Sequence, residues 1–151
     1  MRRVFGVTAT GILVTGALLG AAVAQEKKEI IHVDSAKTMH VDSAKATYKE
    51  LAPGALAAVL WGDLDKGPYG AFTKFTPGAN FPLHTHTNDI RIVVLKGAYL
   101  YKPENGEEKW VAAGQYIFLP GGDRHASGGD AKEGVLFYQE STGKFDLNFV
   151  K

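Results

Sequence analysis

The chain predicts an all-β domain, either a small β-barrel or a β-sandwich, and two observations support that prediction. First, short apolar runs rich in Val, Ile, Tyr and Phe recur from residue 55 to residue 150, and Gly, Pro, Asn or Asp separate most of them. Second, no long run with the period of a helix follows the N-terminal segment. Many short strands at regular spacing are typical of a barrel or sandwich, and the interior of a small barrel is filled by side chains or holds one small ligand.

The expected strands follow one another closely along the chain. The apolar runs cover residues 55–61, 69–76, 79–86, 90–101, 107–112, 115–119, 124–127, 133–140 and 145–150. Asn105-Gly106 is a strong hairpin signal. Further turns are expected at Pro77-Gly78, Lys96-Gly97, Ala113-Gly114 and Pro120-Gly121-Gly122.

Residues 1–24 have the pattern of a signal peptide. Arg2 and Arg3 form a basic start, an apolar run covers residues 4–23, and Ala22-Val23-Ala24 fits a cleavage site. We expect cleavage after Ala24, which makes the protein periplasmic or secreted and leaves no stable membrane anchor; an uncleaved anchor is the alternative. The paired arginines also resemble a twin-arginine export signal, although an ordinary secretory signal carries such arginines as well.

Residues 25–50 are a polar segment ahead of the predicted domain, which covers residues 51–151. The sequence HVDSAK occurs at residues 32–37 and again at residues 40–45. Two copies are too few for a repeat architecture. We interpret residues 25–45 as a tether or an added edge strand and the repeat as a slipped duplication, with a metal-scavenging His/Asp tail as the alternative.

Charge and cysteine content exclude several classes of function. The 17 basic residues nearly balance the 16 acidic ones, and loss of Arg2 and Arg3 with the signal leaves 15 basic residues. No basic stripe is present, which argues against nucleic acid or an anionic membrane surface as a partner. The chain has no cysteine, so it has neither disulfides nor thiolate metal ligands.

Three of the five histidines form the candidate site. His84 and His86 are two residues apart on an expected strand, so their imidazoles point to the same face. His125, from a distant strand, can complete a metal site inside a barrel. Neutral imidazole is the commonest metal ligand in proteins.

The spacing around these histidines resembles the two motifs of the cupin superfamily. In the first motif, Gly78 is followed by five residues, His84-Thr85-His86 and then Gly97. In the second, Gly114 is followed by five residues, Pro120-Gly121-Gly122 and then His125. The resemblance covers about residues 55–145. It implies a jelly-roll β-barrel that binds a divalent metal ion (Zn²⁺, Fe²⁺, Ni²⁺ or Cu²⁺) through His84, His86 and His125.

The chain departs from the first motif at its glutamate, the usual fourth metal ligand. That position holds Ile90, between Asp89 and Arg91. Three outcomes stay open: a site of three histidines, a register shift that brings Asp89 to the metal, or a metal-free site in which the histidines bind an anion or are polar members of the core. In the second motif, Gly129 replaces the trailing Asn.

Two further residues are candidates for contacts with a ligand. In strict alternation Arg91 points to the outer face, where it can pair with Asp89; a bulge would let it clamp a substrate carboxylate. Gln139 is a candidate hydrogen-bond partner of a ligand histidine.

Other segments resemble an uncharacterised bacterial cupin subgroup related to the cupin domain of ChrR-type anti-sigma factors: Trp61-Gly62-Asp63, Gly67-Pro68-Tyr69-Gly70, residues 85–91 and Gly143-Lys144-Phe145-Asp146. The chain lacks the zinc-binding anti-sigma domain of those proteins, so we exclude a sigma-factor partner.

The leading hypothesis is an exported metallo-cupin that acts on or binds a small polar molecule, with dioxygenase-like or isomerase-like chemistry if it is an enzyme. The alternative is a non-catalytic periplasmic module that binds or senses a ligand or metal. Family resemblance also suggests a homodimer.

Overall fold

The computed structural model describes residues 38–151. The predicted signal peptide and the first HVDSAK copy, including His32, lie outside the described residues. Between residues 38 and 151, no helix is long and apolar enough to cross a membrane.

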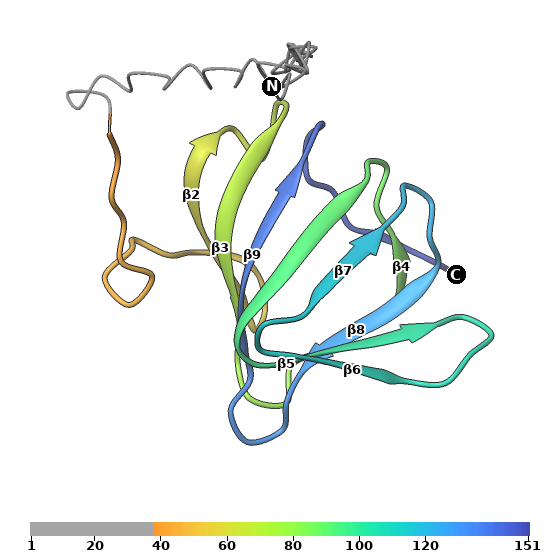
Figure 1. Cartoon of the computed structure of the whole chain (residues 1–151). Coiled ribbons are helices and arrows are strands. Elements are labelled where there is room, and N and C mark those ends of the chain that lie inside the picture. The colour runs from red at the N-terminus through yellow and green to blue at the C-terminus, as the bar shows by residue number, and fades with distance from the viewer. Residues whose placement is uncertain (1–37) are drawn as a thin grey trace, which may run out of the picture. The chain divides into compact units, whose positions relative to one another are not determined.

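The described chain is built from β-strands, which confirms the all-β prediction (Figure 1). The strands are β1 (Lys49–Ala52), β2 (Ala55–Gly62), β3 (Tyr69–Phe75), β4 (Asn80–Thr85), β5 (Ile90–Pro103), β6 (Lys109–Ala112), β7 (Tyr116–Leu119), β8 (His125–Gly129), β9 (Val135–Ser141) and β10 (Asn148–Phe149). Each expected apolar run contains one of the strands β2 to β10 or overlaps it. β1 was not expected, because it is short and lies in a polar stretch.

The strands form a curled antiparallel sheet that folds over on itself (Figure 1). One half has the order β1-β2-β3-β9-β5-β7, and the other half has the order β6-β5-β8-β4-β10. The long strand β5 belongs to both halves. Its first part pairs with β7 and β9, and its second part pairs with β6 and β8. Sharing one strand between the halves closes the sheet around an interior.

Gly97 lies where β5 passes from one half to the other. Its φ of 71° is in the left-handed region that favours glycine. A Cβ atom here would lie 2.2 Å from the carbonyl oxygen of Gly134, so the turn before β9 can approach only a glycine. The backbone conformation at this bend of β5 therefore requires Gly97, the last glycine of the first motif.

The interior is mainly apolar and aromatic. The largest core cluster comprises Ile90, Ile92, Val94, Tyr99, Val111, Leu119, Val135 and Phe137. Along β9, buried residues alternate with half-buried ones, as expected for a strand with one face on the core. The inward-facing residues of β9 include the polar Gln139 and Ser141, both 3% exposed. Buried polar groups need partners: Ser141 Oγ accepts a hydrogen bond from the Gly143 N–H across 3.2 Å, and Gln139 lines an interior cavity.

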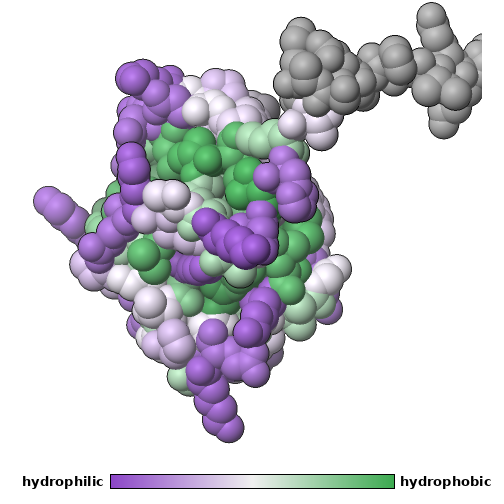
Figure 2. Space-filling model, turned by 90° about the vertical axis from the view of Figure 1, so that its left-hand side faces the viewer, coloured by the Kyte–Doolittle hydropathy of each residue, from purple (hydrophilic) through white to green (hydrophobic). Residues whose placement is uncertain are grey.

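The outer surface carries apolar residues as well. Seen from the side of β2, hydrophobic surface is gathered between hydrophilic side chains (Figure 2), and Val59 and Trp61 are the large exposed apolar residues of that strand.

The Asn105-Gly106 hairpin joins β5 to β6 as expected. Neither turn residue has a positive φ, so the tight two-residue turn is not used. Instead the Gly106 N–H donates to the Pro103 carbonyl across 3.2 Å.

Candidate metal centre

The fold brings the three predicted histidines together. His84 is on β4, His86 follows its end, and His125 begins β8, where it is the register partner of His84. All three are buried, and one ring nitrogen of each lies within 4.8 Å of the others. The ring centroids are 4.5 Å apart for His84 and His125 and 5.0 Å for His84 and His86. The cluster could therefore hold a metal ion.

Each Nδ1 atom has a backbone carbonyl as partner, so each ring presents its Nε2 atom to the site. His84 Nδ1 lies 2.6 Å from the carbonyl oxygen of Pro82, and His125 Nδ1 lies 3.2 Å from that of Asp123. His86 Nδ1 lies 2.5 Å from the carbonyl oxygen of Asp146. A carbonyl only accepts hydrogen bonds, so Nδ1 carries the proton and Nε2 keeps a free lone pair.

The His125 Nε2 atom tests whether a metal fits. It is buried and has no hydrogen-bond partner among the described residues. A buried polar atom without a partner costs stability, and a cation among three Nε2 lone pairs would remove that cost. The donor set and its orientation thus fit a divalent metal ion.

Two of the orienting carbonyls come from local sequence. Pro82 and Asp123 each stand two residues before the histidine they contact. The Asp123 carboxylate also lies 3.1 Å from His125 Nδ1 and accepts a hydrogen bond from the Tyr101 hydroxyl across 3.0 Å. Burial, assisted by this carboxylate, raises the pKa of Tyr101 to about 12, so the phenol stays protonated and donates. Tyr101 and Asp123 together support the orientation of His125.

The third carbonyl comes from the C-terminal segment, residues 143–150, which the sequence predicted as a strand but not as part of the site. The Asp146 carboxylate accepts hydrogen bonds from Thr87, at the backbone N (2.8 Å) and at Oγ1 (2.5 Å). The Phe145 ring lies 5.4 Å from the His86 ring, and Phe149 pairs with His84 in the β4–β10 ladder. The segment is thereby tied to the residues around the site.

Burial shifts the pKa of all three histidines downward. Desolvation is the largest cause in each case, and the carbonyl hydrogen bonds oppose it. For His84 the pKa falls to about 4. The rings are therefore neutral near pH 7, which is the form that binds metal.

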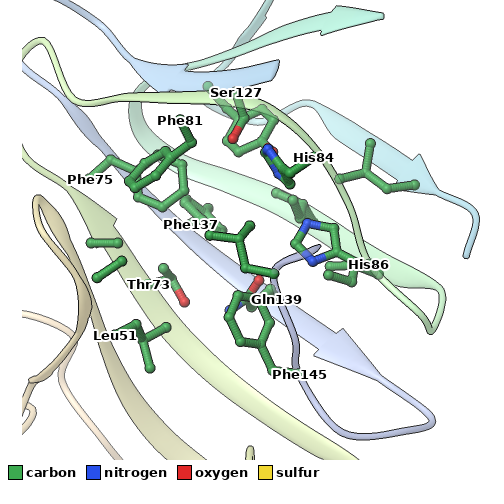
Figure 3. Close-up of a pocket in the computed structure, with 17 residues that line it drawn as sticks. Leu51, Thr73, Phe75, Phe81, His84, His86, Ser127, Phe137, Gln139 and Phe145 are labelled. Atoms are coloured by element: carbon green, nitrogen blue, oxygen red, sulfur yellow. The ribbon is translucent and has the colours of Figure 1, made fainter. Parts of the chain in front are cut away.

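A cavity of about 70 Å³ adjoins His84 and His86 (Figure 3). Its walls are mostly apolar, with Phe75, Phe137 and Phe145 among them. The non-histidine polar side chains that line it are Thr73, Tyr99, Ser127 and Gln139. No Asp, Glu, Lys or Arg is among the described residues that line this cavity.

The remaining candidate residues fall on two sides of the sheet. Ile90, at the position of the motif glutamate, is buried and lines the cavity with Gln139. Asp89 lies apart from the three histidines: its Oδ1 accepts a hydrogen bond of 2.9 Å from the Gly121 N–H. Arg91 lies 4.0 Å from the Asp89 carboxylate and stacks over the Phe118 ring. The Nδ1 atoms of the histidines contact the three carbonyls and, at His125, the Asp123 carboxylate, and Gln139 is not among these partners.

The described residues have the cupin fold: a curled antiparallel β-barrel with the motif histidines facing its interior. The chain belongs to the family described as "Domain of unknown function (DUF4437)", whose family model matches residues 29–149. No match was found among curated proteins.

Solved structures share the fold at low sequence identity. The polyketide cyclase RemF from Streptomyces resistomycificus superposes with a TM-score of 0.62 at 18% identity, covering 76% of this chain and 87% of that one. A cupin-like protein from Ralstonia eutropha gives 0.59 at 23% identity, covering 76% and 78%. The DMSP lyase DddQ from Ruegeria pomeroyi gives 0.54 at 17% identity, covering 66% and 57%.

Proposed function

We propose that this protein is an exported metallo-cupin that binds a divalent metal ion through His84, His86 and His125 and accepts a small molecule in the adjoining cavity. One observation carries the proposal: three buried imidazoles direct Nε2 atoms toward one another while backbone carbonyls hold their Nδ1 atoms. A histidine kept only for packing has no need of such an arrangement.

The donor set favours a borderline transition metal. Three neutral nitrogen ligands without a carboxylate or thiolate suit Zn²⁺, Fe²⁺, Ni²⁺ or Cu²⁺ and leave coordination positions open. When bound, such an ion supplies Lewis acidity or activates oxygen. The protein's part is to hold the three rings through Pro82, Asp123 and Asp146 and to exclude water with the apolar walls of the cavity.

Catalysis on a small molecule is the first candidate activity. The polyketide cyclase and the DMSP lyase show by their names that enzymes acting on small molecules use this fold. Non-catalytic binding or sensing is the second candidate, and one observation favours it: the cavity walls described above carry no carboxylate or lysine that could serve as an acid or base. Turnover of any substrate by the metal-loaded protein would exclude the second candidate.

The test of the metal site is elemental analysis of protein purified without chelator or a histidine tag. We expect near-stoichiometric metal in the natural protein and loss of tight binding in His84→Ala and in His125→Ala, because two imidazoles remain in each. The control is His40→Ala, since His40 is exposed and outside the cluster. Equal metal content in all four proteins would refute the site.

Export rests on the sequence of residues 1–24. Mass spectrometry of the protein from its native compartment should show a mature N-terminus at Gln25. Detection of residues 1–24 in the purified protein would contradict cleavage at Ala24.

Self-association is the last part of the proposal. Val93 and Leu95 on β5 and Tyr116 and Phe118 on β7 are all exposed, and Val93 pairs with Tyr116 in register. Adjacent exposed apolar side chains of this size mark contact surfaces. We expect a second copy to cover them, giving a homodimer. A monomer by light scattering at micromolar concentration would contradict this expectation.

A further inference from the structure

The interior of the barrel holds a polar pair that the metal site does not use. Thr73 on β3 and Gln139 on β9 both line the cavity, and they are 1% and 3% exposed. Figure 3 shows Thr73 and His84 on opposite sides of the space, with Gln139 between Thr73 and His86. A ligand bound at the histidines would therefore have this pair facing its other end.

The side chain of Thr73 lowers the stability of the folded protein at its position. Its Oγ1 atom is buried and has no hydrogen-bond partner among residues 38–151. An unpaired buried hydroxyl is destabilising, and a valine of the same shape would avoid that cost. The strand around it is otherwise well suited to valine, because β-branched residues are favoured there. A hydroxyl kept at this point is explained by a partner that enters the cavity.

The register partners of the polar pair are small residues. Across the β2–β3 ladder, Thr73 faces Ala57, and across the β3–β9 ladder, Gln139 faces Ala71. Both alanines are buried. The cavity itself is lined by the small residues Ala52, Ala55 and Ser127 as well as by Phe, Leu, Ile and Tyr side chains.

The size of the cavity and the absence of charged side chains in its lining limit which ligands can enter it. A cavity of about 150 Å³ holds a benzene ring, so the 70 Å³ here holds about three non-hydrogen atoms. A charged group among these walls would lack a counter-ion, because the residues that line the cavity include no Asp, Glu, Lys or Arg. The part of the ligand that enters must be short and uncharged.

We propose that Thr73 and Gln139 form a recognition site for the uncharged, hydrogen-bonding end of a short oxygen compound whose other end binds the metal. The hydroxyl and the amide can each donate and accept, so a hydroxyl or carbonyl group is recognised by both. This inference rests on the proposed metal site and narrows its ligands to those with an apolar link of one or two carbons between the two oxygen groups.

The experiment compares two probes on the zinc-loaded protein by calorimetry. 3-Hydroxypropanoate has a carboxylate for the metal and a three-atom tail that ends in a hydroxyl. Butanoate has the same length but ends in a methyl group. We expect 3-hydroxypropanoate to bind at least about fivefold more tightly than butanoate, the gain of one or two hydrogen bonds. Equal affinity of 3-hydroxypropanoate and butanoate would overturn the proposal.

Variants of Thr73 and Gln139 distinguish a role in ligand recognition from a role in the stability of the fold. Thr73→Val and Gln139→Leu should each remove the preference for 3-hydroxypropanoate, with butanoate binding changed less than about twofold. Thr73→Val should not lower the melting temperature of the free protein, because the hydroxyl has no partner there. Thr76→Val, the same change at an exposed residue, is the matched control. A lower melting temperature for Thr73→Val, or an unchanged preference, would show that the hydroxyl serves the fold or an ordered water only.

The zinc titration that precedes these measurements keeps the two proposals apart. Failure of zinc to bind, or binding that survives His84→Ala, refutes the metal site itself. Zinc binding without discrimination between the two probes refutes only the recognition site.

Discussion

The backbone carbonyl of Asp146 accepts the hydrogen bond of His86 Nδ1 at 2.5 Å, although sixty residues separate them. The side chain of Asp146 secures this contact, since its carboxylate binds the backbone N and Oγ1 of Thr87, the residue after His86. One residue thus orients a candidate metal ligand with its main chain and docks its own segment with its side chain.

The first prediction concerns this anchor. Asp146→Ala should weaken metal binding about tenfold, because the segment loses its hold on Thr87 and His86 loses a fixed orientation. The measurement is competition with a chromophoric chelator. Asp130→Ala is the matched control, since Asp130 also caps backbone N–H groups, at Lys132 and Glu133, but outside the site. Equal affinity of the Asp146 variant and the natural protein would contradict this role.

The second prediction is that the metal-free protein loses stability as the pH falls from 6.5 to 4. Burial lowers the pKa of His84 from 6.5 in the unfolded chain to about 4 in the folded protein. Between these values the unfolded state binds more protons, so the contribution is complete above pH 6.5 and is lost toward pH 4. For His84 alone it amounts to about 3 kcal/mol, and His86 and His125 shift in the same direction.

Urea unfolding at a series of pH values measures this loss. His84→Gln has no group to titrate at this position and should show a smaller dependence on pH. His40→Gln removes an exposed histidine and should keep the full dependence. Stability that is constant between pH 6.5 and 4.5 would show that the rings are not desolvated in solution.

The third prediction restores the missing carboxylate of the first motif. Ile90 is 2% exposed and lines the cavity beside His84 and His86. Ile90→Glu should tighten metal binding by about tenfold through a fourth ligand. It should also destabilise the metal-free protein by about 2 kcal/mol or more, because a carboxyl group is buried without a partner. Arg91→Glu, on the outer face, should leave metal affinity unchanged; an equal effect of both variants on metal affinity would contradict the inward placement of residue 90.

The fourth prediction separates steric from conformational demands on glycine. Gly97→Ala should destabilise the fold by more than about 2 kcal/mol, because it combines a φ of 71° with a 2.2 Å clash against Gly134. Gly78→Ala has a similar φ of 74° but no atom within 4 Å of the added Cβ, so about 1 kcal/mol is expected. Thermal unfolding of both variants gives the comparison, and equal losses would mean that β5 does not need the close approach.

The positions of most strands could be predicted from local sequence. Alternation along β9 and the glycines or prolines between runs mark the strands, because both features act within a few residues. The same holds for His84 and His86, whose spacing of two puts them on one face, and for the Pro82 and Asp123 carbonyls, which lie two residues before their histidines. β1 was missed because Lys49 and Glu50 are polar and exposed and only Leu51 and Ala52 are apolar, so its pairing with β2 leaves no apolar pattern.

By itself, the sequence determined the all-β class and the three histidines, since strand periodicity and motif spacing are properties of neighbouring residues. Only the tertiary structure decided which distant groups complete the site. The Asp146 carbonyl reaches His86 because β10 pairs with β4, and Thr73 and Gln139 share a cavity because β3 pairs with β9. Such contacts depend on how the sheet closes, and closure is set by pairing between strands far apart in the chain, which no local pattern records.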